Sequence, residues 1–315
     1  MLKNLIIQLC DSAPSFCHYI NKKWKLPRLM FAETLKKGIE WAMKRNLDVH
    51  IIYPDYEINP ELKYEIEVME TGTMGSIISK NKQEVFICKS IEELEKVPKD
   101  VGGIVILNIK FSEFHKNYDK ITKSLQYLGK LNLVINNIEE LNELDFDEYK
   151  FILTQFIPII VDEYKKEHYI QFNVLTDRLM LIEMNNCNAG LDTITLAPNG
   201  RFYICPAFYY ENPDNSVGDV DSDIEIPNLQ LYKIQNAPIC RTCDAFHCKR
   251  CVWLNQKMTL EVNTPSHEQC VLSHIERNAS KQLLNELKAN GINIEVAEIK
   301  DIDYLDPFEK FIKNK

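Results

Sequence analysis

The chain has 315 residues, of which 45% are hydrophobic, and its formal net charge at pH 7 is −9. This length and composition are typical of a globular protein with a large buried core, and they favour two domains over one. The negative charge repels a phosphate backbone and an anionic membrane surface, so it excludes nucleic acid and membrane as favoured partners but tolerates a neutral or basic peptide.

Apolar runs are short throughout the chain. The run at residues 5–9 is too short for the core of a signal peptide, and residues 156–161 are interrupted by Pro158 and fall far below the roughly 18 residues that a membrane span needs. We therefore expect a cytoplasmic protein. A reducing cytoplasm disfavours disulfides, so the clustering of the ten cysteines indicates metal binding.

Residues 1–180 alternate short β-rich runs with amphipathic stretches, which is typical of βα units in a mainly parallel sheet. Two helix starts carry capping signals, Asn59 with Pro60 and Ser90 with Glu93. Pro158 lacks a backbone donor and is expected to kink or end the helix that contains it. The predicted strands are residues 5–9, 49–53, 104–107, 131–135 and 169–174, and the predicted helices are 31–42, 60–70, 111–128 and one that starts near Asp145.

The pattern changes after about residue 180, where cysteines become dense and β segments become short. Residues 193–196 and 202–205 are expected to form a hairpin around a turn at 198–200, which brings Cys187 and Cys205 within reach of one site. The tail is predicted to contain a helix over 271–288, a strand over 292–296 and a final helix over 307–312.

A central cysteine run has the spacing C-x2-C-x4-C-x2-C, in which successive thiolates can converge on one metal centre. An apolar core gives no reason to place four cysteines among charged and polar residues, so we do not interpret them as unliganded core residues. Thiolates bind both zinc and iron–sulfur clusters, so the run alone leaves both open. The run consists of Cys240, Cys243, Cys248 and Cys251.

Three outlying cysteines extend the set of candidate ligands. Cys187 and Cys205 precede the central run, and Cys270 follows it. Seven thiolates are one short of two complete four-ligand centres. Because an odd count suits one closed centre and one open centre, it favours iron–sulfur clusters and leaves zinc as the alternative.

The seven positions resemble the SPASM domain of radical-SAM peptide maturases. That pattern has a first cysteine, a glycine followed after four residues by a cysteine, a run of four cysteines and a last cysteine. Cys187, Gly200 with Cys205, the central run and Cys270 fill every position, although two gaps within the run are each one residue shorter than in the family.

The resemblance implies two auxiliary [4Fe–4S] clusters. The second would be closed, whereas the first would keep an open iron that could take a substrate thiolate or amine. The first cluster would be held by Cys187, Cys205 and Cys251, which we call the three-cysteine set. The second would be held by Cys240, Cys243, Cys248 and Cys270, which we call the four-cysteine set.

The loop after the first predicted strand lacks the radical-SAM motif. A radical-SAM barrel carries C-x3-C-x2-C there, because three thiolates leave the fourth iron free to bind S-adenosylmethionine. This chain has only Cys10 and Cys17, separated by six residues, and residues 53–57 stand in place of the expected glycine-rich segment. S-adenosylmethionine is therefore not expected, and the N-terminal half looks like a partial or degenerate, radical-SAM-like (β/α) barrel.

The overall layout is similar to the CXXX-repeat peptide maturases of bacterial peptide-modification cassettes. This resemblance implies a protein that acts in the maturation of a small, ribosomally made, cysteine-repeat precursor peptide. The alternatives are a non-catalytic peptide-recognition or electron-transfer partner of another maturation protein, or a zinc-stabilised binding module. No catalytic residue is assigned. The expected domains are a degenerate barrel over 1–183, a SPASM domain over 184–280 and a helix–strand tail over 281–315.

Several other residues allow more than one interpretation. Cys10, Cys17 and Cys88 are interpreted as small core residues rather than ligands. His247, within the central run, is a candidate eighth ligand, although its loop is too short to fold back easily. The aromatic residues 208–210 are attributed to hairpin packing rather than to peptide binding. Polar residues after predicted strands are candidates for a substrate pocket or ordinary loop residues: Asp11, Asp55, Glu57, Asn108, Lys110, Asn136 and Asn137.

Overall fold

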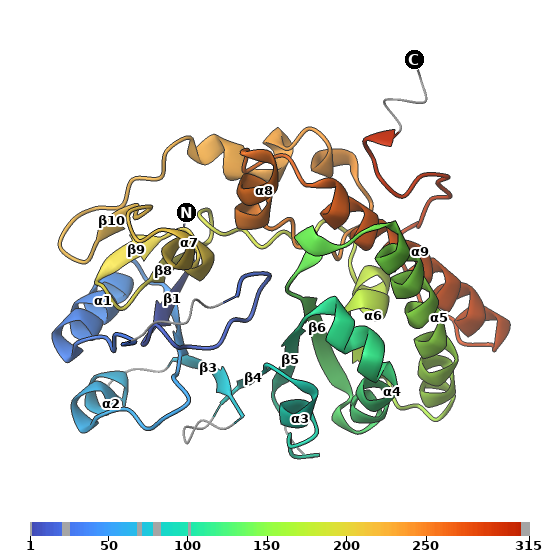
Figure 1. Cartoon of the computed structure of the whole chain (residues 1–315), viewed down its shortest axis with the longest axis horizontal. Coiled ribbons are helices and arrows are strands. Elements are labelled where there is room, and N and C mark those ends of the chain that lie inside the picture. The colour runs from blue at the N-terminus through green and yellow to red at the C-terminus, as the bar shows by residue number, and fades with distance from the viewer. Residues whose placement is uncertain (1, 21–25, 68–70, 78–82, 100–101, 310–315) are drawn as a thin grey trace.

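The computed structural model describes residues 2–20, 26–67, 71–77, 83–99 and 102–309. Within these residues ten strands form one curved sheet in the order β10-β9-β8-β1-β2-β3-β4-β5-β6-β7 (Figure 1). Neighbouring strands from β8 through β1 to β7 are parallel, whereas β9 pairs antiparallel with both β8 and β10. The strands are β1 (Asn4–Gln8), β2 (Asp48–Ile52), β3 (Gly72–Ser76), β4 (Val85–Cys88), β5 (Ile104–Ile109), β6 (Lys130–Ile135), β7 (Gln171–Phe172), β8 (Thr193–Leu196), β9 (Arg201–Tyr203) and β10 (Gly218–Asp219).

Helices follow most of the parallel strands and cover the outer face of the sheet (Figure 1). Because β10 and β7 are the two ends of the strand order in the described part of the chain, the sheet is an open, partial barrel. The predicted α/β partial barrel is confirmed. The α-helices are α1 (Ala32–Lys44), α2 (Pro60–Glu67), α3 (Ile91–Leu94), α4 (Phe111–Leu128), α5 (Glu143–Lys165), α6 (Asn173–Met180), α7 (Pro206–Glu211), α8 (Val252–Thr259) and α9 (His267–Ala289), and the short 3₁₀ helices are η1 (Ile138–Glu140), η2 (Leu229–Tyr232), η3 (Ile234–Asn236) and η4 (Cys240–Thr242).

The first strand shows how the sheet buries both of its faces. Leu5 and Ile7 are fully buried in the main core, to which the outer helices also contribute. Ile6 points to the other face, where it packs with Ala13 and Ile52 in a small second cluster. A strand buried on both sides reads as a continuous apolar run, which is why residues 5–9 were recognisable from sequence.

The strand expected over 169–174 is wrong in its second half. The chain pairs only at Gln171–Phe172 and then turns into α6. The side chain of Asn173 takes over the pairing with the neighbouring strand, accepting a hydrogen bond from the backbone nitrogen of Leu133 at 2.8 Å and donating one to its carbonyl oxygen at 2.9 Å. An asparagine that bonds to backbone in this way ends the strand without leaving β6 unsatisfied.

Pro158 does not end its helix, because α5 continues through it to Lys165. Buried residues on both sides of the proline, Ile157 and Ile160 among them, hold the helix against the core despite the missing donor. Residues 292–296, expected as a strand, have no strand partner among the described residues and form no regular secondary structure. The expected helix over 307–312 and the end of the one over 60–70 fall partly outside the described residues.

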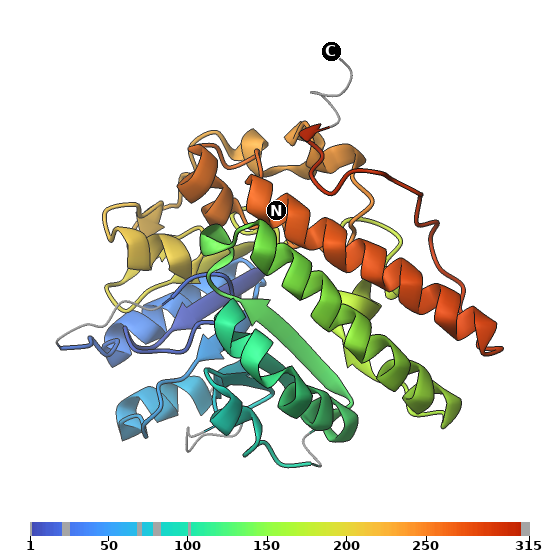
Figure 2. The ribbon, with the colours of Figure 1, turned by 45° about the vertical axis from the view of Figure 1, so that its right-hand side comes forward.

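The C-terminal part of the chain is joined to the barrel in two ways. β8, which follows the expected boundary near residue 183, pairs in register with β1, so one sheet runs across that boundary. Helix α9 lies alongside α5 (Figure 2), and Tyr149 of α5 donates a hydrogen bond of 2.6 Å to Glu276 of α9. The domain limits stay a prediction. In the described part of the chain, no helix combines the length and the apolar character needed to cross a bilayer.

Candidate metal centre

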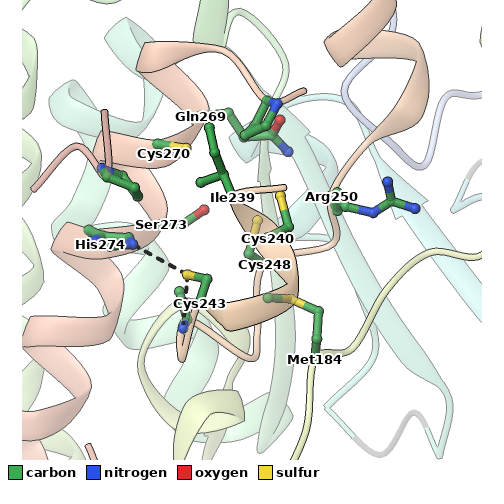
Figure 3. Close-up of a pocket in the computed structure, with 13 residues that line it drawn as sticks. Met184, Ile239, Cys240, Cys243, Cys248, Arg250, Gln269, Cys270, Ser273 and His274 are labelled. Carbon is green, nitrogen blue, oxygen red and sulfur yellow. Dashed lines mark hydrogen bonds between the residues drawn. The ribbon is translucent and has the colours of Figure 1, made fainter. Parts of the chain in front are cut away.

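The four-cysteine set gathers in one pocket (Figure 3). Three of its members come from the turns around η4, where the backbone nitrogen of Cys243 donates to the carbonyl of Cys240 and that of Cys248 donates to the carbonyl of Ala245. The fourth, Cys270, lies in the first turns of α9. The structure thus brings together the four cysteines that the resemblance assigned to one cluster.

The thiols in this pocket are largely shielded from solvent. Burial raises the pKa of Cys240 and of Cys243 to about 12, and the negative charges of neighbouring thiolates contribute to both shifts. His274 contacts the sulfur of Cys243 through its Nε2 atom at 3.4 Å (Figure 3). A group of buried thiols that repel one another on ionisation is stabilised as thiolates by a bound cation, so this donor set fits a metal centre.

The three-cysteine set lies in a second, larger cavity of about 320 Å³. The inner faces of β1, β5, β6 and β8 form one side of this central cavity, and residues from the C-terminal segment form the other. Burial raises the pKa of Cys251 to about 12 and the pKa of Cys205 well above its ordinary value, and thiolate charge within the set contributes to both shifts. The second group predicted from sequence therefore also converges, around a cavity that adjoins the first, because Cys248 lines both.

Arg250 links the two cysteine sets. Its side chain is only 1% exposed, lines the pocket of the four-cysteine set and is also close enough to Cys187 for their charges to interact. Its Nε atom donates to Asn186 at 3.0 Å and its Nη2 atom donates to the carbonyl of Tyr232, but Nη1 has no hydrogen-bond partner among the described residues. A buried guanidinium with an unsatisfied donor fits an anionic, thiolate-ligated cluster beside it.

Two further buried arginines fix the loop between Cys243 and Cys248. Arg178 of α6 donates to the backbone oxygen of Asp244 at 2.6 Å. Arg277 of α9 donates to both carboxylate oxygens of Asp244, each at 2.6 Å. These bonds join α6, α9 and the cysteine loop, and sequence patterns had not singled out any of the three residues.

Cys17, in the loop after β1, lies close to the three-cysteine set. It lines the central cavity together with the three-cysteine set, and it is partly buried rather than part of the fully buried core. Cys10 and Cys88 are fully buried and line neither cavity. The interpretation as core residues therefore suits those two and not Cys17. Its only sequence signal was its position after the first strand.

His247 also lines the central cavity. Its Nε2 atom is 3.0 Å from a carboxylate oxygen of Glu276, while its Nδ1 atom has no hydrogen-bond partner among the described residues. His18 lies at the same cavity, with Nδ1 3.0 Å from the carbonyl oxygen of Ile135. Burial lowers the pKa of His18, so this imidazole is neutral near pH 7.

The polar residues proposed for a substrate pocket do not line the central cavity, and several have structural partners instead. Asp55 pairs with Lys89 at 2.6 Å, and Lys110 lies 3.6 Å from Glu140. The aromatic residues 208–210 belong to α7, directly after the hairpin, and all three are buried, so they offer no exposed peptide-binding surface. The polar residues thus fit the interpretation as ordinary loop residues, and the aromatic residues fit the interpretation as packing residues.

The described part of the chain contains ten free cysteines, and within it no three histidine, cysteine, aspartate or glutamate side chains approach closely enough to be recognised as a site for a single metal ion. What the structure does place together are two groups of thiols at two adjoining cavities, with Cys248 lining both and Arg250 close to members of each group.

No protein-family model matches the chain, and no curated protein matches its sequence. Solved structures do share its fold. Native anSMEcpe with bound AdoMet and a Cp18Cys peptide is 11% identical, with a TM-score of 0.60 over 92% of this chain and 100% of that one. A hexahistidine-tagged form of anSMEcpe with bound AdoMet has a TM-score of 0.61 at 11% identity over the same shares, and native anSMEcpe with bound AdoMet has 0.57 at 12% over 90% and 99%.

This likeness extends over nearly the whole chain and is a likeness of fold. It supports the radical-SAM-like barrel with its C-terminal extension. It also runs counter to one expectation from the sequence, because AdoMet, which we did not expect here, is bound in the proteins that share the fold.

Proposed function

We propose that this chain is a cytoplasmic iron–sulfur protein that acts in the maturation of a small, ribosomally made, cysteine-containing peptide. The observation that carries the proposal is the gathering of the seven cysteines around two adjoining cavities. The three-cysteine set lines the central cavity and the four-cysteine set lines the other, with Cys248 lining both. This arrangement supports the division that the resemblance to SPASM domains implies. A reducing cytoplasm keeps such thiols available for clusters.

Each cysteine set would hold one [4Fe–4S] cluster, which supplies electron transfer when bound. The chain's own residues hold the thiols in position and compensate charge. Arg277 and Asp244 fix the loop of the four-cysteine set, and Arg250 places a buried positive charge next to both sets. Zinc remains the alternative occupant of thiolate sites and is separated from iron by the experiment below.

A peptide substrate is supported by the central cavity and by the proteins that share the fold. The cavity wall is formed largely by apolar strand residues such as Ile106, Val134 and Ile135, which suits the side chains of a short peptide. One of the similar structures, anSMEcpe, was solved with a Cp18Cys peptide. A neutral or basic peptide is also compatible with the negative charge of this chain.

We further propose that the chain does not cleave S-adenosylmethionine reductively. The sulfur of Cys10 lies 3.1 Å from both the Ser12 and Tyr56 hydroxyl groups, and Cys17 lies with the three-cysteine set. Two cysteines placed apart in this way cannot replace the three thiolates of a radical-SAM cluster. The same observation favours a second candidate function, a recognition or electron-transfer partner of another maturation protein.

Metal analysis of anaerobically prepared protein tests the proposal. Two loaded clusters require about eight iron and about eight sulfide per chain and a brown colour. Binding of a cysteine-containing peptide and of its cysteine-to-serine counterpart is then measured with the loaded protein. Colourless protein with stoichiometric zinc would end the iron–sulfur proposal, and loaded protein that binds neither peptide would end the role in peptide maturation.

A further inference from the structure

We propose that Cys17 is the fourth thiolate ligand of the cluster held by the three-cysteine set, so that this cluster is closed by a residue from the barrel. The inference rests on the proposed function, because it concerns the cluster that the set would hold. It replaces the open iron expected from the sequence. On binding, the Cys17 thiol loses its proton to solvent and its sulfur occupies the remaining iron.

The position of the thiol carries the inference. Cys17 lies in the loop between β1 and α1, and this loop brings it to the central cavity, which Cys187, Cys205 and Cys251 also line. The four cysteines therefore line one cavity, and four thiolates are the usual complement of a [4Fe–4S] cluster.

Buried hydrogen bonds fix the backbone at Cys17. Asn108, at the end of β5 and 5% exposed, donates through Nδ2 to the carbonyl oxygens of Cys17 at 2.7 Å and of Ser15 at 3.0 Å. Asn136, which follows β6, donates to Oδ1 of Asn108 at 2.7 Å. The hydroxyl of Ser15 donates to the carbonyl of Tyr19 at 2.6 Å. A ligand on a loop held by its neighbours in this way is preorganised for binding.

The same loop is docked onto the element that follows Cys205. Helix α7 begins directly after this cysteine, and its Tyr209 hydroxyl donates to the carboxylate of Asp11 at 2.5 Å. Tyr210 stacks on Tyr19, with ring centroids 5.5 Å apart, and its hydroxyl donates to the carbonyl of Asp11 at 3.0 Å. The loop and the cysteine set therefore hold each other in place, which a core cysteine would not require.

The competing eighth ligands are less well placed. His247 lies at the central cavity, but its Nε2 atom faces Glu276, whose other oxygen accepts the Tyr149 hydroxyl. Its Nδ1 atom is unpartnered among the described residues, so a matched variant of His247 belongs in the test. Cys10 and Cys88 line neither cavity, and Cys88, a buried strand residue in β4, provides a control.

A closed cluster changes what this site can do. With four protein thiolates it has no iron left for a peptide thiolate or amine, so it can transfer electrons or hold the barrel and the C-terminal segment together. The proposal therefore predicts that small thiols do not bind iron in the wild-type protein and do so once the Cys17 sulfur is removed.

The test uses the full chain, reconstituted anaerobically, as wild type and as the variants Cys17→Ala, Cys17→Ser, His247→Gln and Cys88→Ala. Iron per chain is measured, followed by the electron paramagnetic resonance spectrum of the reduced protein with and without β-mercaptoethanol. We expect the wild-type and Cys88→Ala spectra to be the same and unchanged by the thiol. Cys17→Ala is expected either to lose one cluster's iron or to give a spectrum that shifts when the thiol is added.

Several results would overturn the inference. One is a Cys17→Ala protein with the iron content and spectra of the wild type. Another is a thiol response in the wild type, and a third is loss of iron in His247→Gln alone. A wild type without iron would instead remove the proposed function.

If neither Cys17 variant folds, as judged by circular dichroism, alkylation of the wild-type protein tests whether Cys17 is a ligand. Cys17 and the other seven ligand cysteines should react with N-ethylmaleimide only after a chelator has removed the iron. Equal reaction before and after iron removal would also overturn the inference.

Discussion

Arg277 of α9 holds Asp244 in a two-point ion pair, with Nε to Oδ1 and Nη2 to Oδ2 both at 2.6 Å. The arginine side chain is fully buried, and the aspartate directly follows Cys243. Burial raises the pKa of the Asp244 carboxyl, but the hydrogen bonds and charge of Arg277 outweigh it and leave that pKa below its ordinary value. The cysteine loop is thus fastened to α9, the helix that carries Cys270.

Arg277→Ala should destabilise the protein and loosen the pocket of the four-cysteine set. The substitution leaves Asp244 as a partly buried charge that keeps only Arg178 at 3.9 Å and the backbone nitrogen of Lys300 at 3.3 Å, so we expect the free energy of unfolding to fall by about 3 kcal/mol. Chemical denaturation measures this change, and iron retention on gel filtration measures the second effect. Arg201→Ala is the matched control, because Arg201 is half exposed and 3.9 Å from Asp214, and it should cost less than about 0.5 kcal/mol. Equal stabilities of the two variants would contradict the role given to Arg277.

Single ligand substitutions should separate the two clusters. Cys243→Ala removes a member of the four-cysteine set and Cys251→Ala a member of the three-cysteine set, so each should lose about four iron per chain while the other cluster remains. The two single variants should give different residual electron paramagnetic resonance spectra, and the double variant should be free of iron. A Cys243→Ala protein with the residual spectrum of Cys251→Ala would show that the seven cysteines do not divide as proposed.

Sequence patterns predicted the parts of this fold that depend on local signals. The apolar run of β1 and the spacing of helix Phe111–Leu128 were sufficient to place those elements. Residues 292–296, in which apolar and polar side chains alternate, looked like a strand, but pairing depends on a neighbouring strand, and the described part of the chain offers none there. Pro158 remained inside a helix because packing of α5 outweighed the loss of one donor.

The residues of the candidate site also differ in whether local sequence signals identify them. The spacing of the seven C-terminal cysteines is a local signal, whereas Cys17 has no local signal beyond its place after the first strand and reaches the same cavity only through the fold. Arg250 and Arg277 look like ordinary surface residues in the sequence, and only their burial shows that they compensate charge. Residues that act through distant contacts are the ones that a single sequence does not identify.

S-adenosylmethionine should not be cleaved by the reduced, cluster-loaded protein. Cleavage requires a cluster with three thiolates and one free iron, and the loop after β1 offers Cys10 and Cys17 in different surroundings. Release of 5′-deoxyadenosine is measured by chromatography, with a radical-SAM enzyme assayed in parallel as the positive control. Binding is measured separately by calorimetry, because proteins of the same fold hold AdoMet. Formation of 5′-deoxyadenosine above the level of a Cys17→Ala, Cys10→Ala double variant would refute the prediction.

The protein should retain its metal less well as the pH falls, because the thiol ligands become protonated. Burial raises the pKa of Cys240 and of Cys251 from 9.0 to about 12, so both thiols are protonated in the metal-free protein at neutral pH, whereas a bound ligand is a thiolate. Each ligand therefore releases about one proton on binding, and affinity falls as the pH falls. We expect iron to be lost progressively when the loaded protein is taken from about pH 8 to about pH 5, as followed by visible absorbance.

The metal-free protein should respond to pH in the opposite sense. A thiol whose pKa is higher in the folded than in the unfolded state stabilises the fold below the unfolded value of 9.0, and this stabilisation is lost as the pH rises from there towards about 12. Thermal unfolding of metal-free protein should therefore occur at lower temperature as the buffer becomes more alkaline, while the loaded protein, whose ligands are already deprotonated, should change less. Cys240→Ser is the matched variant, because a hydroxyl does not titrate in this range, and it should weaken the alkaline effect. Metal-free and loaded proteins with the same alkaline dependence would show that these thiols are not the groups that bind the metal.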